Sequence, residues 1–216
     1  MKIKWNGHAS FTLTSDDGTV IVTDPYDPSG YGGVLKYDMV KDRADVALVS
    51  HDHLDHNYVR GLTGNPVVMK SGGQACGIKF TGIKAHHDET GGKERGENTV
   101  FSFSVDGIRV CFVGDLGHRL TPEQIKSIGD VDLLMIPVGG TFTVDASSAA
   151  DVARSLGAKI TIPMHFKTEK CDLPLSAVED FLELVPNVKL LNEFEISLSK
   201  DNIPAAPEVW VLTHAC

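Results

Sequence analysis

Short apolar runs separated by polar turns fill the first two thirds of the chain, a pattern that is typical of β-strands. Two of the turns, Asp16-Asp17-Gly18 and Asp106-Gly107, carry the Asp-Gly pair that favours a tight β-hairpin. We therefore expect strands on both sides of each turn, at residues 10–14, 19–23, 99–105 and 108–114. Further strands are predicted at residues 45–50, 66–69 and 77–84.

The last third of the chain mixes strands with helices. Residues 131–137 and 159–163 are nearly continuous apolar runs, which suit strands that are buried on both faces. Pro122 favours the first turn of a helix, Asp145 is a candidate N-cap, and Gly157 is a candidate helix stop. The expected helices span residues 121–128, 145–156 and 173–185, and short strands are expected at residues 188–192, 193–198 and 208–213.

Composition favours one globular domain. The chain has 216 residues, of which 42% are hydrophobic and 23% charged, as in ordinary soluble proteins. A chain of this length buries roughly 70% of its unfolded surface and folds without disulfides. Residues 29–38 and 88–97 are predicted to be loops rather than linkers, because strands flank them. We predict a single domain over residues 1–216, with layered sheets and outer helices.

Net charge and the lack of targeting signals limit the kinds of partner and the cellular location that we expect. Twenty Lys and Arg against 29 Asp and Glu give a net charge of −9, which argues against nucleic acid but allows a small anionic substrate. Asn6, Gly7 and His8 interrupt the N-terminus before a secretory apolar segment can form. No run approaches the roughly 20 apolar residues that a membrane span needs. We therefore expect a cytoplasmic protein with no membrane partner, and the sequence leaves a homo-oligomer open.

Histidine is the unusual feature of the composition. Three of the nine histidines fall in the run Ser50-His51-Asp52-His53-Leu54-Asp55-His56-Asn57, directly after an apolar strand. Three imidazoles and two carboxylates this close fit neither a strand face nor an amphipathic helix, but they fit divalent cations. His51 and His53 are candidates for one cation, and Asp55 and His56 for a second. The alternative interpretation is a solvated polar turn. The four cysteines form no C-x-x-C pair, which argues against a thiolate metal site.

The H-x-H-x-D-H pattern after a buried strand resembles the metallo-β-lactamase fold superfamily of metal-dependent hydrolases. Four other segments resemble motifs of that superfamily in the same order: Ile21-Val22-Thr23-Asp24-Pro25, Lys84-Ala85-His86-His87, Val113-Gly114-Asp115 and Ile162-Pro163-Met164-His165. The resemblance implies an α/β (α+β) fold that is a four-layer αββα sandwich.

The resemblance also implies the metal ligands. One cation would be held by His51, His53 and His87, a second by Asp55, His56 and His165, and Asp115 would bridge the two. Asp24 matches a position that orients ligands through hydrogen bonds rather than binding metal. Adjacent side chains of a strand point oppositely, so only one of His86 and His87 can face the cations. His87 fits the family pattern better.

Departures from individual branches of the superfamily narrow the activity. The β-lactamases with a cysteine ligand carry it where this chain has Asp115, and the flavodiiron oxygen reductases have glutamate at the position of His53. Antibiotic hydrolysis and redox iron chemistry are therefore disfavoured. The chain resembles a group of small, largely uncharacterised hydrolases that are distant relatives of the ascorbate-6-phosphate lactonases. The segments that carry this resemblance include Gly7-His8-Ala9 and Pro137-Val138-Gly139-Gly140.

We therefore expect a binuclear hydrolase in which a metal-bridging hydroxide attacks a small ester, lactone or phosphoester. The expected cofactors are two Zn²⁺ ions, and the ligand types also suit Mn²⁺, Fe²⁺ or Ni²⁺. Two alternatives stay open: a nuclease or cyclic phosphodiesterase, and a regulatory protein that binds metal without turnover. The negative charge weighs against the first, and the complete set of ligand residues weighs against the second.

Catalytic roles are expected for Asp55 and Asp115, beside their roles as ligands, and for His118. His118 follows Asp115 closely and is a candidate for donating a proton to a leaving group. His8 is a candidate for contact with the metals or the substrate, since the resemblance places a histidine there.

Three positively charged side chains are candidates for binding an anionic substrate. Lys167 lies two residues after His165. Lys93 and Arg95 lie in the loop of residues 88–97, where a solvated charged loop is the commoner interpretation.

Overall fold

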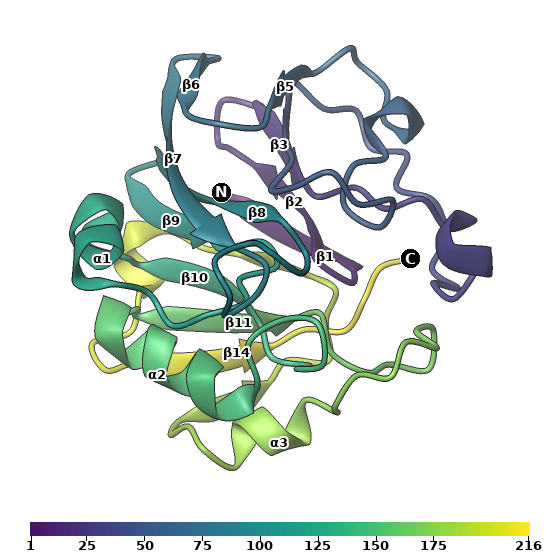
Figure 1. Cartoon of the computed structure of the whole chain (residues 1–216). Helices are drawn as coiled ribbons and strands as arrows, with labels where there is room; N and C mark the ends of the chain where they lie inside the picture. The colour runs from purple at the N-terminus through teal and green to yellow at the C-terminus, as the bar shows by residue number, and fades with distance from the viewer.

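Two β-sheets face each other across a hydrophobic core in the computed structural model of the chain, which describes all 216 residues (Figure 1). In spatial order, the six-stranded sheet contains β13 (Glu195–Ser197), β1 (Lys2–Gly7), β2 (Ser10–Thr14), β3 (Val20–Thr23), β4 (Val46–Leu48) and β5 (Val67–Met69). The eight-stranded sheet contains β12 (Val188–Leu190), β14 (Glu208–Val211), β11 (Ile160–Met164), β10 (Leu133–Pro137), β9 (Ile108–Phe112), β8 (Glu97–Val105), β7 (Ile78–His86) and β6 (Gly73–Ala75). Trp5 and Phe11 of the first sheet share the main core with Phe101 of the second.

The two Asp-Gly turns form the hairpins that the sequence predicts. Asp106 and Gly107 have left-handed backbone angles, with φ of 50° and 75°, and join β8 to β9 as an antiparallel pair. Such angles at both turn positions are what an Asp-Gly pair provides. β2 and β3 are likewise antiparallel across the turn that contains Gly18. The strands on both sides of each turn are confirmed.

The two apolar runs of the last third are also confirmed as strands. β10 and β11 are parallel neighbours, and every residue of both is buried. β1 and β6 were not predicted. In β1 the buried Ile3 and Trp5 alternate with the lysines Lys2 and Lys4, so the period-two signal of a half-buried strand is present there.

Two of the three predicted helices are confirmed, and capping side chains mark where each begins. The side chain of Thr121 caps α1 (Pro122–Ile128), and the side chain of Asp145 accepts a hydrogen bond from the amide of Ser148 at the start of α2 (Ala146–Leu156). Gly157 ends α2 in a left-handed conformation. None of the helices has the length and apolarity to cross a membrane.

The predicted third helix is wrong over most of its length, because only α3 (Glu179–Leu182) is helical. The residues before α3 make long-range backbone hydrogen bonds instead. The amide of Ser176 donates to the carbonyl of Gly139, and the carbonyl of Ser176 accepts from the amide of Lys167. These contacts tie the segment to the loops that follow β10 and β11, and they replace the local bonds of a helix.

The α-helices lie on one side of the two sheets (Figure 1). α1 packs against β7 and α2 against β10, so they cover the eight-stranded sheet. The six-stranded sheet is covered by irregular chain, where Val22, Tyr26 and Tyr37 belong to a small second core. The mixed α/β fold class is confirmed. The layer outside the six-stranded sheet lacks α-helix because residues 25–33 contain two prolines and three glycines, which disfavour it.

Several strands end at one edge of the molecule, and the candidate site residues follow these ends. β3 is parallel to β4, and β9, β10 and β11 are mutually parallel. Asp24 directly follows β3, His87 follows β7 and His165 follows β11. Because the carboxyl ends of parallel strands share an edge, residues far apart in the sequence converge there.

Candidate metal centre

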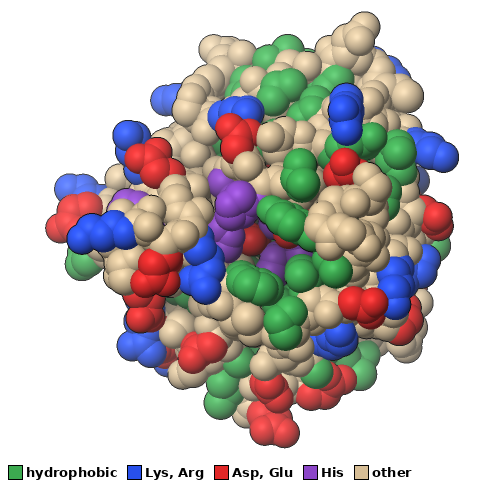
Figure 2. Space-filling view, turned by 45° about the vertical axis from the view of Figure 1, so that its right-hand side comes forward, with side chains coloured by type: hydrophobic (Ala, Val, Ile, Leu, Met, Phe, Trp, Pro, Cys, Tyr) green, Lys and Arg blue, Asp and Glu red, His purple; other side chains and the backbone are tan.

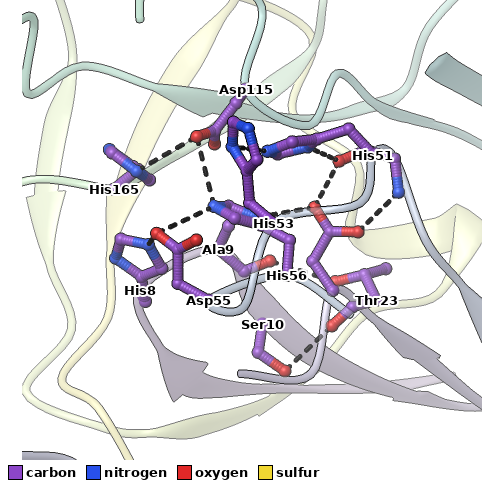
Figure 3. A network of polar contacts seen from close by, with 12 residues as sticks. His8, Ala9, Ser10, Thr23, His51, His53, Asp55, His56, Asp115 and His165 are labelled. Atoms are coloured by element: carbon purple, nitrogen blue, oxygen red, sulfur yellow. Dashed lines mark hydrogen bonds and ion pairs between the residues drawn. The ribbon is translucent and has the colours of Figure 1, made fainter. Parts of the chain in front are cut away.

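The strand ends bring the predicted ligand residues into one largely buried cluster, and Figure 3 labels all of these residues except His87. One group contains His51, His53 and His87, with one ligand atom of each within 4.8 Å of the others. Nε2 of His51 lies 3.0 Å from Nδ1 of His53. His86 points elsewhere, and its ring lies 5.5 Å from that of His118. The structure therefore places His87, and not His86, beside the other two histidines.

A second group contains Asp55, His56 and His165, as the sequence predicts, and adds His8. Nε2 of His8 lies 3.1 Å from Oδ2 of Asp55, and its ring centroid lies 4.1 Å from that of His165. His8 is almost completely buried. The turn after β1 therefore carries this histidine into the cluster.

Asp115 connects the two groups. Its Oδ2 lies 3.1 Å from Nε2 of His56, 3.3 Å from Nε2 of His165 and 3.3 Å from Nε2 of His87. The backbone on both sides of Gly114 is held by Asn98, which donates to the carbonyl of Val113 and accepts from the amide of Asp115. Asn98 is a positioning residue that the sequence did not reveal, because nothing in the local pattern around β8 marks it.

Asp24 lies beneath the cluster and orients two of its histidines. Its Oδ2 accepts a hydrogen bond from Nδ1 of His56 at 2.9 Å and another from the hydroxyl of Ser50 at 2.6 Å. The single hydroxyl proton of Ser50 is used in that bond, so Ser50 accepts from Nδ1 of His51 at 2.8 Å. Both imidazoles then direct Nε2 into the cluster, which is the arrangement of metal-binding histidines.

Three of the residues at this site have strained backbone angles. His8, Asp24 and His165 have positive φ angles of 51°, 33° and 52°, a region that non-glycine residues rarely adopt. Close backbone approach is needed as well. A Cβ atom on Gly139 would overlap the carbonyl oxygen of His165. Strain of this kind persists where surrounding structure imposes it, and it occurs most often at functional sites.

Burial and the neighbouring charges divide the imidazoles into two kinds. Burial lowers the pKa of His51 to about 2 and that of His8 to about 4, so both are neutral at pH 7. Burial would also lower the pKa of His56, but the carboxylates of Asp115 and Asp55 raise it well above its usual value. Burial would raise the pKa of Asp115, but His165 and His56 hold it well below its usual range. The cluster therefore combines neutral imidazoles at His51 and His8, a positively charged imidazole at His56 and an ionised carboxylate at Asp115.

The polar atoms of the cluster fit divalent cations. Seven buried side-chain nitrogen or oxygen atoms of the chain have no hydrogen-bond partner, and all but Asn6 Oδ1 belong to this cluster: His8 Nδ1, Asp55 Oδ1, His56 Nε2, His87 Nδ1, Asp115 Oδ1 and His165 Nδ1. Buried polar atoms are costly when they are unpaired. Imidazole and carboxylate together are the donor set of zinc and related cations.

A cavity of about 320 Å³ opens directly over the cluster. Figure 2 shows histidine and acidic side chains inside this hollow, with hydrophobic side chains at its border. The lining residues are Tyr31, His53, Asp55, His87, Arg95, Asp115, Phe142, His165 and Leu173. Tyr31 and Phe142 were not predicted as site residues, because the loops that carry them have no recognisable motif.

Two predicted site residues lie outside the cavity. Nε2 of His118 accepts a hydrogen bond from the amide of His86 at 3.1 Å, and its Nδ1 lies 2.7 Å from the carbonyl oxygen of Arg119. Both ring nitrogens are thus engaged away from the cluster. Lys167 is exposed, and its Nζ donates to the carbonyl of Leu173 at 3.2 Å. The structure brings neither of them together with the predicted ligands.

Comparisons with known proteins show which family this chain resembles. A family model described as "Beta-lactamase superfamily domain" matches residues 2–165. A relative from Saccharolobus solfataricus, named as a metal-dependent hydrolase, is 31% identical over 86% of this chain and 92% of its own length. A relative from Methanoculleus marisnigri with the same description is 28% identical over 78% of this chain and 82% of its own length.

A crystal structure gives the same result. A protein from Thermotoga maritima, provisionally assigned as a Zn-dependent hydrolase of the metallo-β-lactamase superfamily, is similar to this chain with a TM-score of 0.80. The two are 37% identical, and the similarity covers 98% of this chain and 97% of that one.

Proposed function

The chain belongs to the metallo-β-lactamase superfamily and is a metal-dependent hydrolase, and from this premise we propose that it uses two cations to hydrolyse a small ester, lactone or phosphoester. The observation that carries the proposal is the position of Asp115. One oxygen of its carboxylate lies within 3.3 Å of His87 in the first ligand group and of His56 and His165 in the second. A carboxylate shared in this way suits a pair of cations rather than one.

The proposed ligand sets follow the two groups. His51, His53 and His87 would hold one cation, Asp55, His56 and His165 the other, and Asp115 both. When bound, such a pair supplies a water that is activated near neutral pH and polarises the oxygen of the substrate. Zn²⁺ is the proposed metal, because imidazole predominates in both groups.

Asp55 is placed to move a proton. It lines the cavity, and its Oδ1 has no hydrogen-bond partner. Its other oxygen accepts from Nε2 of His8, which fixes the orientation of the carboxylate. We assign Oδ1 of Asp55 as the atom that accepts a proton during hydrolysis and returns it to the leaving group.

The shape of the cavity favours a small substrate over a nucleic acid. Tyr31, Phe142 and Leu173 wall the space above the cluster, and the volume of about 320 Å³ suits a small molecule. A nuclease needs a long basic surface for the phosphate backbone, whereas this chain carries a net charge of −9.

Two neighbouring histidines test the proposed centre. We expect wild-type protein to contain two zinc ions per chain and to hydrolyse members of a panel of lactones and phosphodiesters, but not RNA. His87→Ala should lose at least one zinc and the activity, because His87 lies in the first ligand group. His86→Ala is the matched control, because its ring packs against His118 outside the cluster, and it should keep both.

Elemental analysis and the same panel with Zn²⁺ or Mn²⁺ give the readouts. A wild-type chain that holds one zinc, or an unchanged His87→Ala protein, would contradict the binuclear centre. Bound metal without turnover on any member would favour a regulatory metal-binding protein.

A further inference from the structure

We propose that Arg95 is the residue that recognises an anionic group of the substrate, so that the cavity takes a small molecule with an oxyanion, phosphate or carboxylate, attached to an apolar portion. This inference rests on the proposed function, because it names the substrate class of the same site. Three features of the structure carry it: the fold of the loop after β7, the contacts of the Arg95 guanidinium, and the other residues that line the cavity.

The loop after β7 folds around the carboxylate of Asp88. Oδ1 of Asp88 accepts hydrogen bonds from the amide and hydroxyl of Thr90, at 2.8 Å and 2.9 Å, and from the amide of Gly92 at 2.8 Å. Oδ2 accepts from the amides of Glu94 at 3.0 Å and Arg95 at 2.8 Å. Asp88 is only 3% exposed. The amide of Arg95 is itself one of the donors, so Asp88 fixes where the side chain of Arg95 begins.

The carboxylate of Asp88 holds four residues of this loop: Thr90, Gly92, Glu94 and Arg95. A carboxylate that accepts several backbone hydrogen bonds gives a loop one preferred conformation. Asp88 is therefore a positioning residue for Arg95.

The guanidinium of Arg95 has no close carboxylate partner. Its nearest acid is Glu94, at 3.8 Å and on an exposed side chain, and its Nη2 makes one long hydrogen bond of 3.4 Å to the carbonyl of Thr141. Arg109 is different, because its guanidinium lies 2.7 Å from Asp130 and 2.5 Å from Asp132. The planar group of Arg95 thus keeps donors available for a planar or tetrahedral oxyanion.

Arg95 faces both the cluster and the apolar wall. It is the only lysine or arginine among the residues that line the cavity, together with His53 and His87 on the side of the cluster. Its guanidinium carbon lies 5.8 Å from the ring centroid of Phe142, which belongs to the apolar wall with Tyr31 and Leu173. A substrate anion held by Arg95 would leave the rest of a small molecule between the apolar wall and the proposed cations.

The other positively charged side chains near the site do not line the cavity. Lys93, from the same loop, is exposed and does not line the cavity. Lys167 follows His165 closely, but its Nζ bonds to the carbonyl of Leu173 and it does not line the cavity either. The geometry thus selects Arg95 from the three cations that the sequence leaves as candidates.

Calorimetric titration of the zinc-loaded chain tests the inference without turnover. Phenylphosphonate and benzoate each join an aromatic ring to an oxyanion, and acetohydroxamate is a control that binds metal without an anionic tail. Arg95→Gln should raise the Kd of phenylphosphonate, benzoate or both by about tenfold or more, the loss expected for a charge-assisted hydrogen-bonded pair. The Kd of acetohydroxamate and the zinc content should not change.

Two further variants make the result specific. Lys93→Gln removes the same charge from the same loop and should leave all three affinities within about twofold. Arg95→Lys keeps the charge but loses the planar donors, and it should bind the oxyanions with intermediate affinity.

Several outcomes would overturn the inference. They are the absence of phenylphosphonate and benzoate binding to the wild-type chain, equal affinities in Arg95→Gln and Lys93→Gln, and equal weakening of acetohydroxamate. Loss of zinc from Arg95→Gln would also overturn it, since the residue would then serve the centre. Failure of the proposed hydrolysis is a separate result, because neither oxyanion probe is hydrolysed.

Discussion

Nδ1 of His56 lies 2.9 Å from Oδ2 of Asp24, and both side chains are completely buried. The same carboxylate oxygen accepts from Ser50, which in turn contacts His51. One aspartate that binds no metal in the proposed centre therefore orients a histidine of each ligand group. A carboxylate behind a ligating histidine fixes its tautomer and increases its basicity.

Asp24→Asn should weaken zinc binding by about 10- to 100-fold, because the NH₂ group of the new side chain faces a donor in either orientation. It meets the backbone amide of Ser50 in one orientation, and Nδ1 of His56 and the hydroxyl of Ser50 in the other. Competition with a fluorescent zinc chelator measures the affinity. Asp27→Asn is the matched control, since Asp27 is also buried but bonds to Ser29 outside the cluster. Wild-type affinity in Asp24→Asn would show that the orientation is not needed.

Asp115→Ala should retain less than half of the metal of the wild-type chain, because its carboxylate contacts imidazoles of both proposed ligand groups. Elemental analysis of the purified proteins measures the metal, and circular dichroism checks that the variant is folded. Full occupancy in a folded variant would count against the bridging role.

His118→Asn should keep its metal and lose little activity, because both nitrogens of the ring are engaged outside the cavity. Removal of a general acid would instead lower kcat by about 10²- to 10⁴-fold. Steady-state rates on any substrate of the wild-type chain, measured across pH, decide between the two. A large drop in kcat with metal intact would restore the proton-donor role to His118.

Gly139→Ala should displace His165 and lower the zinc content, because the added Cβ would overlap the carbonyl oxygen of His165. Gly73→Ala provides a comparison without this overlap, since the nearest atom to its Cβ is the methyl carbon of Met69 at 3.5 Å. Zinc analysis and thermal unfolding of both variants test the expectation. Equal zinc contents would mean that the loop after β10 moves to make room.

Acid should weaken one stabilising contact away from the centre. Hydrogen bonds from Arg109 lower the pKa of Asp132. A pKa that is lower in the folded than in the unfolded chain stabilises the fold fully above the ordinary aspartate pKa of about 4, and this stabilisation is lost as the pH falls towards the lowered value.

The difference in urea midpoint between the wild-type chain and Asp132→Asn should therefore be larger at pH 7 than at about pH 3. Loss of metal at acidic pH affects both proteins and cancels in this difference. A difference that does not depend on pH would contradict the role of the Arg109 contact.

Local signals predicted most of the fold. The Asp-Gly hairpin after β8, the apolar strands β10 and β11, and the capped ends of α2 depend on neighbours in the sequence, and all are confirmed. The prediction of the third helix was wrong over most of its length because the amide of Ser176 donates to the carbonyl of Gly139, a residue far away in the chain. No local pattern contains that contact.

The sequence by itself determined the chemical identity of the candidate centre, because His51, His53, Asp55 and His56 lie within one turn after a buried strand. Only the tertiary structure decided which distant groups reach it. Among the candidates that the sequence names, it directs the ring of His118 away from the cluster, places His8 beside Asp55, and brings Arg95 to the cavity through a loop folded around Asp88. The physical reason is that ligand type follows from side-chain chemistry, whereas access to the cavity depends on long-range hydrogen bonds and packing that neighbouring residues do not encode.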